Sequence, residues 1–327
     1  MAVYQTLLQI IQSAQRELGL PVASTVIGNS DQTTVQMYAF ANQELDELRQ
    51  RHLWTVLQNE YNLVVSPPVE TTGDVALNSA VINNIPDTSG LVANYMTVSG
   101  PSIPAAARIV SIDSPTQITM SMEATAATTT ADLTFSRDTY PEPADFDSFI
   151  GNTWWDRTNR WSLLGPDSPQ VDQWHRSGIV TFGPRRHFRQ LGSFASSITG
   201  GVVTQVNYRI WPPPAEITEP LQLVFEYLSF NCVYVSGNPA VRSFQFANDA
   251  DVPILNSRAI IMGIKWRFWS QKGFDWTGMR TDYDNYVDRL ASRDGGADKL
   301  QLARGYQSVL INSYQVQDGY FPGPGNP

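Results

Sequence analysis

Cysteine is almost absent from this sequence, since Cys232 is the only one in 327 residues. A single cysteine excludes an intrachain disulfide framework and any zinc site built from cysteines. Because Cys232 lies in the apolar stretch NCVYV, we expect a buried structural thiol in a reducing compartment.

Long apolar runs are also lacking. The best candidate, RAIIMGIKWRFW, is interrupted by Lys265 and Arg267 and cannot span a bilayer. The opening stretch, MAVYQTLLQIIQSAQRELG, has no basic segment, and its apolar residues recur at helical spacing, unlike a secretory signal. The sequence therefore predicts a soluble protein made in a cytoplasm, with no membrane partner.

Basic charge is scarce. The chain has 22 Lys and Arg against 31 Asp and Glu, a net charge of -9. Because contacts from Lys and Arg to phosphates supply most non-specific DNA affinity, such a chain is a poor clamp on DNA, although DNA could slide past its surface. Only Lys265, Lys272 and Lys299 are lysines. This bias fits arginine-rich packed interfaces and fits a codon or host bias equally well.

Familiar catalytic and metal-binding motifs are missing as well. His52, His175 and His187 are far apart, and none has a second ligand at metal-binding spacing. No nucleotide-binding, zinc-protease or nucleophile-elbow pattern occurs. We therefore predict a protein that is not an enzyme and has no catalytic, metal-binding or cofactor-binding residues.

Two groups of carboxylates keep other functions open. Four carboxylates lie in one loop near the tryptophans: Asp138, Glu142, Asp145 and Asp147. Two of them could act as the acid and base of a glycosidase, although neighbouring prolines favour a rigid surface connection. Two further pairs could bind a divalent cation: Asp249 with Asp251, and Asp294 with Asp298. Loop and helix-cap roles are favoured for these pairs, because the spacing of an EF-hand is missing.

Helical periodicity marks the N-terminal segment, residues 1–61. Apolar residues at helical spacing predict a helix over 7–18, which Gly19 ends. Asp31 can cap a second helix over about 32–58. A short loop between two amphipathic helices predicts a helical hairpin.

Helical periodicity returns over residues 251–304. One predicted helix carries apolar residues from Ile254 to Trp269, and a second covers about 281–303. Helices at both ends of the chain can meet as one bundle from which the β part projects.

The chain between these ends has β character. Short alternating stretches separated by turn residues predict an inserted small β module over 62–136, in which Arg108 is the only basic residue. Residues 137–250 predict a larger β-rich domain, with strands in GIVTFGP, QVNYRIWPPP and LQLVFEYLSFNCVYV. Residues 305–327 predict an extended arm. The fold class is therefore α+β: a bundle of N- and C-terminal helices, a large central β region of sandwich or barrel type, and an extended C-terminal arm.

Aromatic residues concentrate in NTWWDRTNRWSLLGP, where Trp154, Trp155 and Trp161 alternate with arginines such as Arg157. Such a stretch can stack bases or sugar rings, or it can form a packed joint in a structural protein. A nucleic-acid platform requires basic surroundings, yet residues 137–250 hold 9 basic and 11 acidic residues. A packed joint is favoured, with these four residues at an interface.

The order of segments resembles the head-to-tail adaptor (connector) proteins of tailed phages, which form a ring under the portal. The stretch FANQELDELRQRHLWTVLQNEY is similar to the family's apolar helix with an aromatic-rich exit. The block YPEPADFDSFIGNTWWDRTNRWSLLGPDSPQVDQW is similar to its Pro-Asp-Phe, Trp-Asp-Arg and Gly-Pro succession. YRIWPPPAEITEPLQLVFEYLS resembles its proline corner, and SQKGFDWTGMRTDYDNYVDRLASRDGGA its last helices. The resemblance covers roughly two-thirds of the chain, and residues 66–136 depart from it.

The resemblance implies a structural virion protein, a homo-oligomeric ring of twelve subunits in the phage neck. The portal would lie above it and a tail or nozzle protein below. Genomic DNA would pass through the helical part without sequence-specific binding. An arm can wrap a partner when it orders on binding. We expect Tyr314, Tyr320 and Phe321 to anchor this arm on a neighbouring subunit or on the portal.

Two other classes of function stay open. A carbohydrate- or receptor-binding tail module requires exposed tryptophan faces, whereas an adaptor joint requires those rings to be buried. A wall-degrading glycosidase of the tail requires Glu142 and Asp145 in a cleft.

Overall fold

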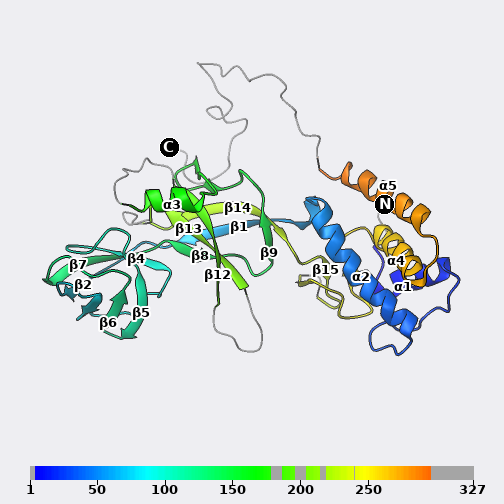
Figure 1. Cartoon of the computed structure of the whole chain (residues 1–327), viewed down its shortest axis with the longest axis horizontal. Helices are drawn as coiled ribbons and strands as arrows, with labels where there is room; N and C mark the ends of the chain where they lie inside the picture. The colour runs from blue at the N-terminus through cyan, green and yellow to red at the C-terminus, as the bar shows by residue number, and fades with distance from the viewer. Residues whose placement is uncertain (1–3, 178–185, 196–203, 214–218, 239, 296–327) are drawn as a thin grey trace, which may run out of the picture.

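Three parts follow one another along the long axis of the molecule. The computed structural model describes residues 4–177, 186–195, 204–213, 219–238 and 240–295. Figure 1 shows a helical bundle at one end, a central β part, and a small β part at the other end. Each part has its own apolar core. The predicted α+β class, with a large β region between helices, is confirmed.

The helical bundle unites the two ends of the described chain. It consists of α1 (Leu7–Glu17), α2 (Gln32–Arg51), α4 (Ser257–Lys272) and α5 (Thr277–Ala291). Helix α4 packs against the other three helices. Asp31 caps α2 as predicted, because its carboxylate accepts the Thr34 amide at 3.0 Å. The expected meeting of N- and C-terminal helices in one bundle is confirmed.

Two predicted helix ends are wrong. Helix α2 stops at Arg51, because the backbone of His52 is extended and a 3-10 turn leads directly into β1 (Gln58–Val65). Strand β1 pairs along its whole length with β14 (Leu221–Ser229), so a distant strand binds the backbone groups that a longer helix would have bound locally. The last helix ends at Ala291, and residues 296–303 of its predicted extension lie outside the described residues.

An ion group is buried inside the bundle. The carboxylate of Glu44 in α2 accepts hydrogen bonds from the Arg267 guanidinium in α4 and from the Tyr283 hydroxyl in α5. All three residues are almost fully buried. A Cβ atom at Gly263 of α4 would overlap the carboxylate. Glycine at this position therefore leaves the space that Glu44 occupies.

A β-sandwich forms the middle of the molecule. One sheet has the strand order β1-β14-β10-β11, and β9 also pairs with β14. The strands not yet given are β9 (Phe146–Phe149), β10 (Trp155–Asp156) and β11 (Trp161–Ser162). The second sheet, β12-β13-β8, contains β8 (Thr139–Pro141), β12 (His187–Ala195) and β13 (Thr204–Trp211). The two sheets share one apolar core.

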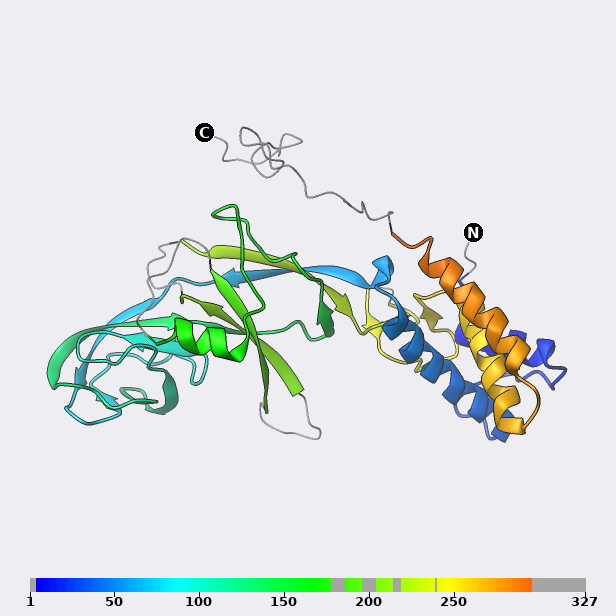
Figure 2. The same cartoon turned by 45° about the horizontal axis from the view of Figure 1, so that its top comes forward.

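The strands β1 and β14 also connect the sandwich to the bundle. Figure 2 shows them as a long paired ribbon that runs toward α2. Residues 58–61, predicted as part of the helical segment, therefore belong to the central sheet. The strand predicted in QVNYRIWPPP is β13. The stretch LQLVFEYLSFNCVYV is divided into β14 and, after residues 230–232, β15 (Val233–Tyr234). The strand predicted in GIVTFGP, and the predicted arm over 305–327, lie outside the described residues.

A small barrel lies at the far end. Six antiparallel strands follow the order β4-β7-β2-β3-β6-β5: β2 (Val69–Val75), β3 (Val81–Asn83), β4 (Met96–Ser99), β5 (Ile109–Ser114), β6 (Gln117–Met120) and β7 (Thr128–Arg137). An antiparallel bridge joins Thr97 of β4, the first strand in this order, to Arg108, which directly precedes β5, the last strand. The six strands therefore close into a barrel. The core contains aliphatic side chains, methionines and one phenylalanine. This barrel occupies most of the segment 62–136, in which the sequence predicted a small β module, whereas residues 62–65 of that segment belong to β1 of the central sheet.

A short third sheet packs on the bundle. It contains β15 (Val233–Tyr234), β16 (Arg242–Ser243) and β17 (Val252–Pro253). Cys232, just before β15, is fully buried, and its thiol donates to the Phe244 carbonyl at 3.4 Å. Burial raises the pKa of this thiol to about 12. The predicted buried structural thiol is confirmed.

Candidate functional site

Among the clustered tryptophans, Trp154 lies in the core of the sandwich. Its ring is stacked between Phe188 and Phe225, with ring centroids 4.5 and 4.1 Å away. Tyr208 meets it edge-on at 5.0 Å. Only 1% of Trp154 is exposed, so this side chain packs within the subunit and cannot touch another chain. Its predicted place at an interface is corrected to a place in the core.

Trp155 and Trp161 remain at the surface, with 39% and 40% of each residue exposed. They belong to the β10–β11 hairpin, in which Trp155 opposes Ser162 and Trp161 opposes Asp156. Because successive residues of a strand point to opposite faces, this register places the two rings on opposite faces of the hairpin. They therefore offer two separate contacts and do not form one flat platform for bases or sugars.

The hairpin turn holds the two arginines of this stretch. Buried Asp156 accepts hydrogen bonds from the Asn159 amide and side chain, each at 2.9 Å, and closes the turn. Arg157 pairs with Glu60 of β1 at 2.6 Å, and both side chains are half exposed. The predicted polar turn between packed segments is confirmed. Since an exposed ion pair contributes little stability, Arg157 can leave Glu60 and pair with a carboxylate of another molecule at a small cost in free energy.

The remaining predicted interface residues lie outside the described residues: Tyr314, Tyr320 and Phe321. Their anchoring role stays a prediction. Asp298, paired with Asp294 in the sequence analysis, lies outside them as well.

The four carboxylates considered for a glycosidase each bind a different element. Asp145 accepts hydrogen bonds from two hydroxyls of β14 at 2.8 and 2.7 Å, and Asp147 pairs with an arginine of α2 at 2.5 Å. Glu142 accepts from Gln190 of β12 at 3.1 Å, and burial raises its pKa to about 7. Asp138 is fully buried between two arginines. These contacts tie the loop to its surroundings in several directions.

A chain of buried charges joins the barrel to the sandwich. Arg108 donates to both oxygens of Asp138, at 2.6 and 2.9 Å. Arg209 of β13 lies 3.7 Å from Asp138 and donates to Asp172 at 3.0 Å. Asp172 belongs to α3 (Pro169–His175) and also accepts from Arg189 of β12 at 2.6 Å. The lone basic residue of the predicted insert therefore anchors the barrel, and the same chain of charges holds α3 on the sandwich.

Two of the three histidines, which are far apart in the sequence and have no second ligand at metal-binding spacing there, lie together in the structure. His175 ends α3, and His187 begins β12. The Nδ1 atom of each lies 3.2 Å from Oδ2 of Asp167. Ligand atoms of these three residues all lie within 4.8 Å of one another, a spacing at which they could hold a metal ion. His52 lies apart, edge-on to Trp54.

The acidic pairs considered as cation sites act as loop caps. Asp249 accepts the backbone amides of Val26 and Ile27, the latter at 2.7 Å. Asp251 accepts three backbone amides, from Ser236, Ala247 and Asn248. Asp294 accepts the amide and the hydroxyl of Thr55, at 2.8 and 2.6 Å. The favoured loop and cap roles are confirmed for these three residues.

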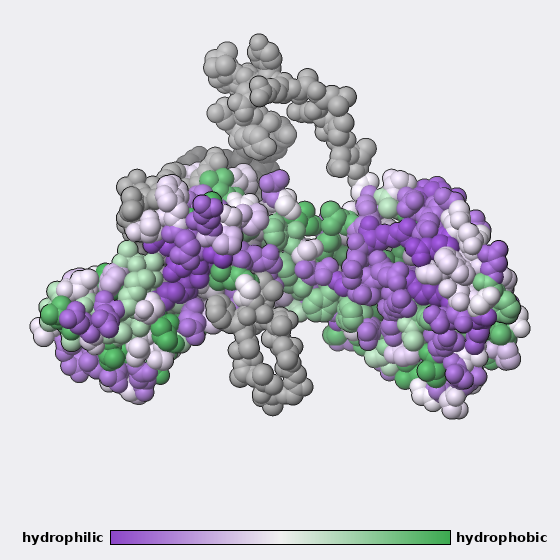
Figure 3. All heavy atoms as spheres, viewed as in Figure 1, coloured by the Kyte–Doolittle hydropathy of each residue, from purple (hydrophilic) through white to green (hydrophobic). Residues whose placement is uncertain are grey.

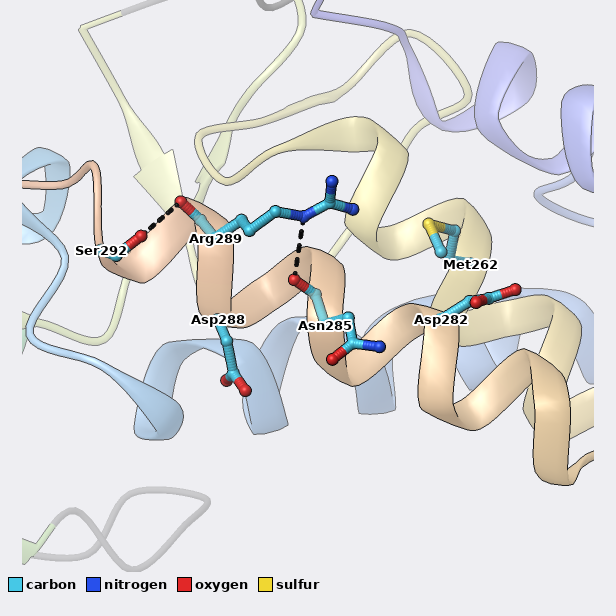
Figure 4. Close-up of a pocket in the computed structure, with 6 residues that line it drawn as sticks. All are labelled: Met262, Asp282, Asn285, Asp288, Arg289 and Ser292. Carbon is cyan, nitrogen blue, oxygen red and sulfur yellow. Dashed lines mark hydrogen bonds between the residues drawn. The ribbon is translucent and has the colours of Figure 1, made fainter.

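A polar hollow follows the outer side of α5. Its lining comes from α4, from α5 and from the residue that follows α5: Met262, Asp282, Asn285, Asp288, Arg289 and Ser292. Figure 4 shows Arg289 turned back along its own helix, where Nε donates to the Asn285 carbonyl at 3.1 Å, while Asp288 points to the other side. Figure 3 shows hydrophilic residues gathered over α5, and hydrophobic ones over the connection between sandwich and bundle. The hollow is an open polar helix face, unlike the apolar concave pockets that hold small ligands.

No protein-family model matches this chain, and no curated protein is significantly similar to it. In the part of the chain that the structure describes, none of the helices has the length and the apolar character needed to cross a membrane. Functional inference therefore depends on the residues and their arrangement.

Proposed function

We propose that the chain is a subunit of a head-to-tail connector ring, a structural virion protein between a phage portal and the tail. The observation that carries the proposal is the architecture. Helices from both ends of the chain meet in one bundle, and two separately cored β parts project from it in a row (Figure 1). A ring of twelve such subunits would place the bundles around a DNA channel and the β parts outward or toward the tail.

The tryptophan hairpin fits this proposal if its two exposed rings, which an adaptor joint requires to be buried, become buried between subunits of the ring. Trp155, Trp161 and Arg157 lie exposed on a short hairpin that the sandwich core holds rigidly through Trp154. Tryptophan and arginine are the residue types most enriched at interface hot spots. Two rings on opposite faces of one hairpin suit a subunit that is contacted from two sides, as every subunit of a ring is.

The charge of the chain also supports it. A net charge of -9 disfavours tight binding to phosphates, and Asp282 and Asp288 line the hollow on the outer side of α5. If this face of the bundle borders the channel, genomic DNA passes without sticking.

The test is the mass of the full chain by light scattering, alone and mixed with the portal protein of the same phage. We expect a stable ring-shaped assembly with the portal, visible by electron microscopy. Replacing both Trp155 and Trp161 by alanine should prevent the assembly and leave the melting temperature within a few degrees of the wild type. Trp174→Ala, which removes a 59% exposed tryptophan outside the hairpin, is the matched control. A monomer that ignores the portal contradicts the proposal.

The arm provides an independent test. Deleting residues 305–327 should abolish portal attachment and leave the circular dichroism spectrum of the folded parts unchanged. Normal assembly without the arm would contradict the anchoring role of Tyr314, Tyr320 and Phe321.

A carbohydrate- or receptor-binding tail module is the second candidate, and the exposure of Trp155 and Trp161 in the single chain favours it. Acrylamide quenching of tryptophan fluorescence separates the two functions. A connector predicts that quenching falls when the portal is added, whereas a receptor-binding module predicts no change with the portal and a fall with its glycan.

A further inference from the structure

We propose that Asp167, His175 and His187 form a binding site for a divalent transition-metal ion, with Zn²⁺ as the best fit. The site clamps α3 to β12 on the sandwich. This inference does not depend on the proposed connector function, because it rests only on the geometry of the three side chains.

The distances fit a shared ion. Two ligands at the usual zinc distances of about 2.0–2.1 Å, set at the tetrahedral angle, lie about 3.3 Å apart. Oδ2 of Asp167 is 3.2 Å from Nδ1 of His175 and 3.2 Å from Nδ1 of His187. The two imidazole rings lie side by side, with centroids 4.5 Å apart and planes at 61°. Both rings therefore place Nδ1 near the same oxygen of one carboxylate.

The ligands are held by rigid elements. The backbone amide of Asp167 donates to the Phe188 carbonyl of β12 at 2.9 Å, and a parallel bridge joins Leu164 to His187. His175 is fixed through its helix, because Asp172 of α3 is ion-paired with two strands of the sandwich. A site whose ligands are positioned before the ion arrives loses little conformational entropy on binding.

The chemistry of the three ligands selects the ion. Imidazole nitrogen suits zinc, copper, iron and nickel, whereas calcium and magnesium prefer sites made of oxygen ligands. One carboxylate and two neutral imidazoles would neutralise half the charge of a divalent ion. The three side chains are largely buried, with His187 the most accessible at 22% exposure, which leaves a way in. In a tetrahedral site the fourth position is open to water or to a ligand from another molecule.

The experiment uses the full chain, stripped with a chelator and then titrated with Zn²⁺ by calorimetry, with bound metal measured by mass spectrometry. We expect one zinc per chain and a higher melting temperature with zinc. Cobalt(II) in place of zinc should show the strong d–d absorption of a four-coordinate site. His175→Gln and His187→Gln should each weaken zinc binding by more than the roughly 10- to 100-fold that is typical of changes outside the ligand shell.

His52→Gln is the matched control, because His52 lies outside the cluster, and it should bind zinc like the wild type. If a histidine variant does not fold, the nearly isosteric Asp167→Asn and the cobalt spectrum of the wild type still test the site. The inference is overturned if the folded wild type binds no stoichiometric zinc, or if all three ligand variants bind it as the wild type does. The cluster would then be a hydrogen-bonded Asp and two His only.

Discussion

The bundle and the junction between barrel and sandwich both contain buried ion groups, but the two groups differ in what they join. In the bundle, Glu44, Arg267 and Tyr283 meet inside a single apolar core that both ends of the chain build. At the junction, Arg108 and Asp138 meet between two parts that have separate cores. The first group is therefore part of one cooperative unit, and the second connects two units.

This difference decides what each group contributes. A buried ion pair seldom adds much net stability, but removing one partner leaves an uncompensated charge in the core. Loss of Glu44 should therefore destabilise the whole bundle. Loss of Asp138 should mainly release the barrel, because the aliphatic core of the barrel does not depend on that pair.

The largest effect is expected for Glu44→Ala. It leaves the buried Arg267 guanidinium with only the half-exposed carboxylate of Glu47, at 2.6 Å, as a charged partner. Unfolding of the bundle should therefore become easier by about 3–5 kcal/mol. Chemical denaturation followed by circular dichroism at the helical minimum measures this loss. The double replacement of Glu44 and Arg267 by methionine should recover most of the stability, because no buried charge remains. If Glu44→Ala hardly changes the free energy of unfolding, the Glu44–Arg267 pair is not part of the cooperative core of the bundle, and this expectation is contradicted.

Asp138→Ala should cost about 2–3 kcal/mol, less than Glu44→Ala, because Arg108 at the edge of the junction can regain water. Calorimetry should resolve a separate transition for the barrel, and limited proteolysis should cut between the barrel and the sandwich. Asp132→Ala, which removes an exposed carboxylate of β7, is the control and should leave a single transition. Unfolding of both parts together in the Asp138 variant would contradict the separation of the two units.

Gly263→Ala tests how tightly the bundle group is packed. Its new Cβ overlaps the Glu44 carboxylate, which two partners hold in place, so we expect a loss of about 1–3 kcal/mol. The same change at Gly278 of α5, where the new Cβ would meet no atom of another element or side chain within 4 Å, should stabilise the helix by up to about 1 kcal/mol. Comparing the melting temperatures of the Gly263→Ala and Gly278→Ala variants separates the effect of the steric overlap from the effect of helix propensity.

Glu142→Gln should have the smallest effect, and that effect should depend on pH. Burial raises the pKa of Glu142 from 4.5 to about 7, so the folded state binds a proton that the unfolded state releases between these values. The wild type therefore loses stability from this group as pH rises from 4.5 to 7. The glutamine variant should gain about 1 kcal/mol relative to the wild type at pH 8 and nothing at pH 4. Equal differences at both pH values would contradict the shift.

Local patterns predicted much of the fold. The apolar spacing of residues 7–18 and the cap at Asp31 depend on neighbours within one or two helical turns, so α1 and the start of α2 were predicted correctly. The end of α2 was not, because it depends on β14, which lies more than 160 residues further along the chain. Helical spacing alone could not show that a strand partner exists.

The candidate sites show the same division. The polar turn between Trp155 and Trp161 was predictable from its own residues. The burial of Trp154 and the exposure of its neighbour Trp155 were not, because alternate residues of a strand face different surroundings. Arg108 was noticed as a lone cation, but its partner Asp138 could not be assigned. His175 and His187 carry no spacing signal, since a helix end and a strand start bring them together.

The sequence by itself determined that the N-terminal segment and the segment over 251–295 are mainly helical and that the chain between them has β character. It also determined the cap at Asp31, the buried thiol of Cys232 and the scarcity of basic charge. These features depend on composition and on interactions between near neighbours. Only the tertiary structure decided which tryptophan is buried, where the barrel is anchored and that two histidines share one aspartate. The physical reason is that burial and pairing depend on what packs opposite a residue, and in this chain that partner usually comes from a distant segment.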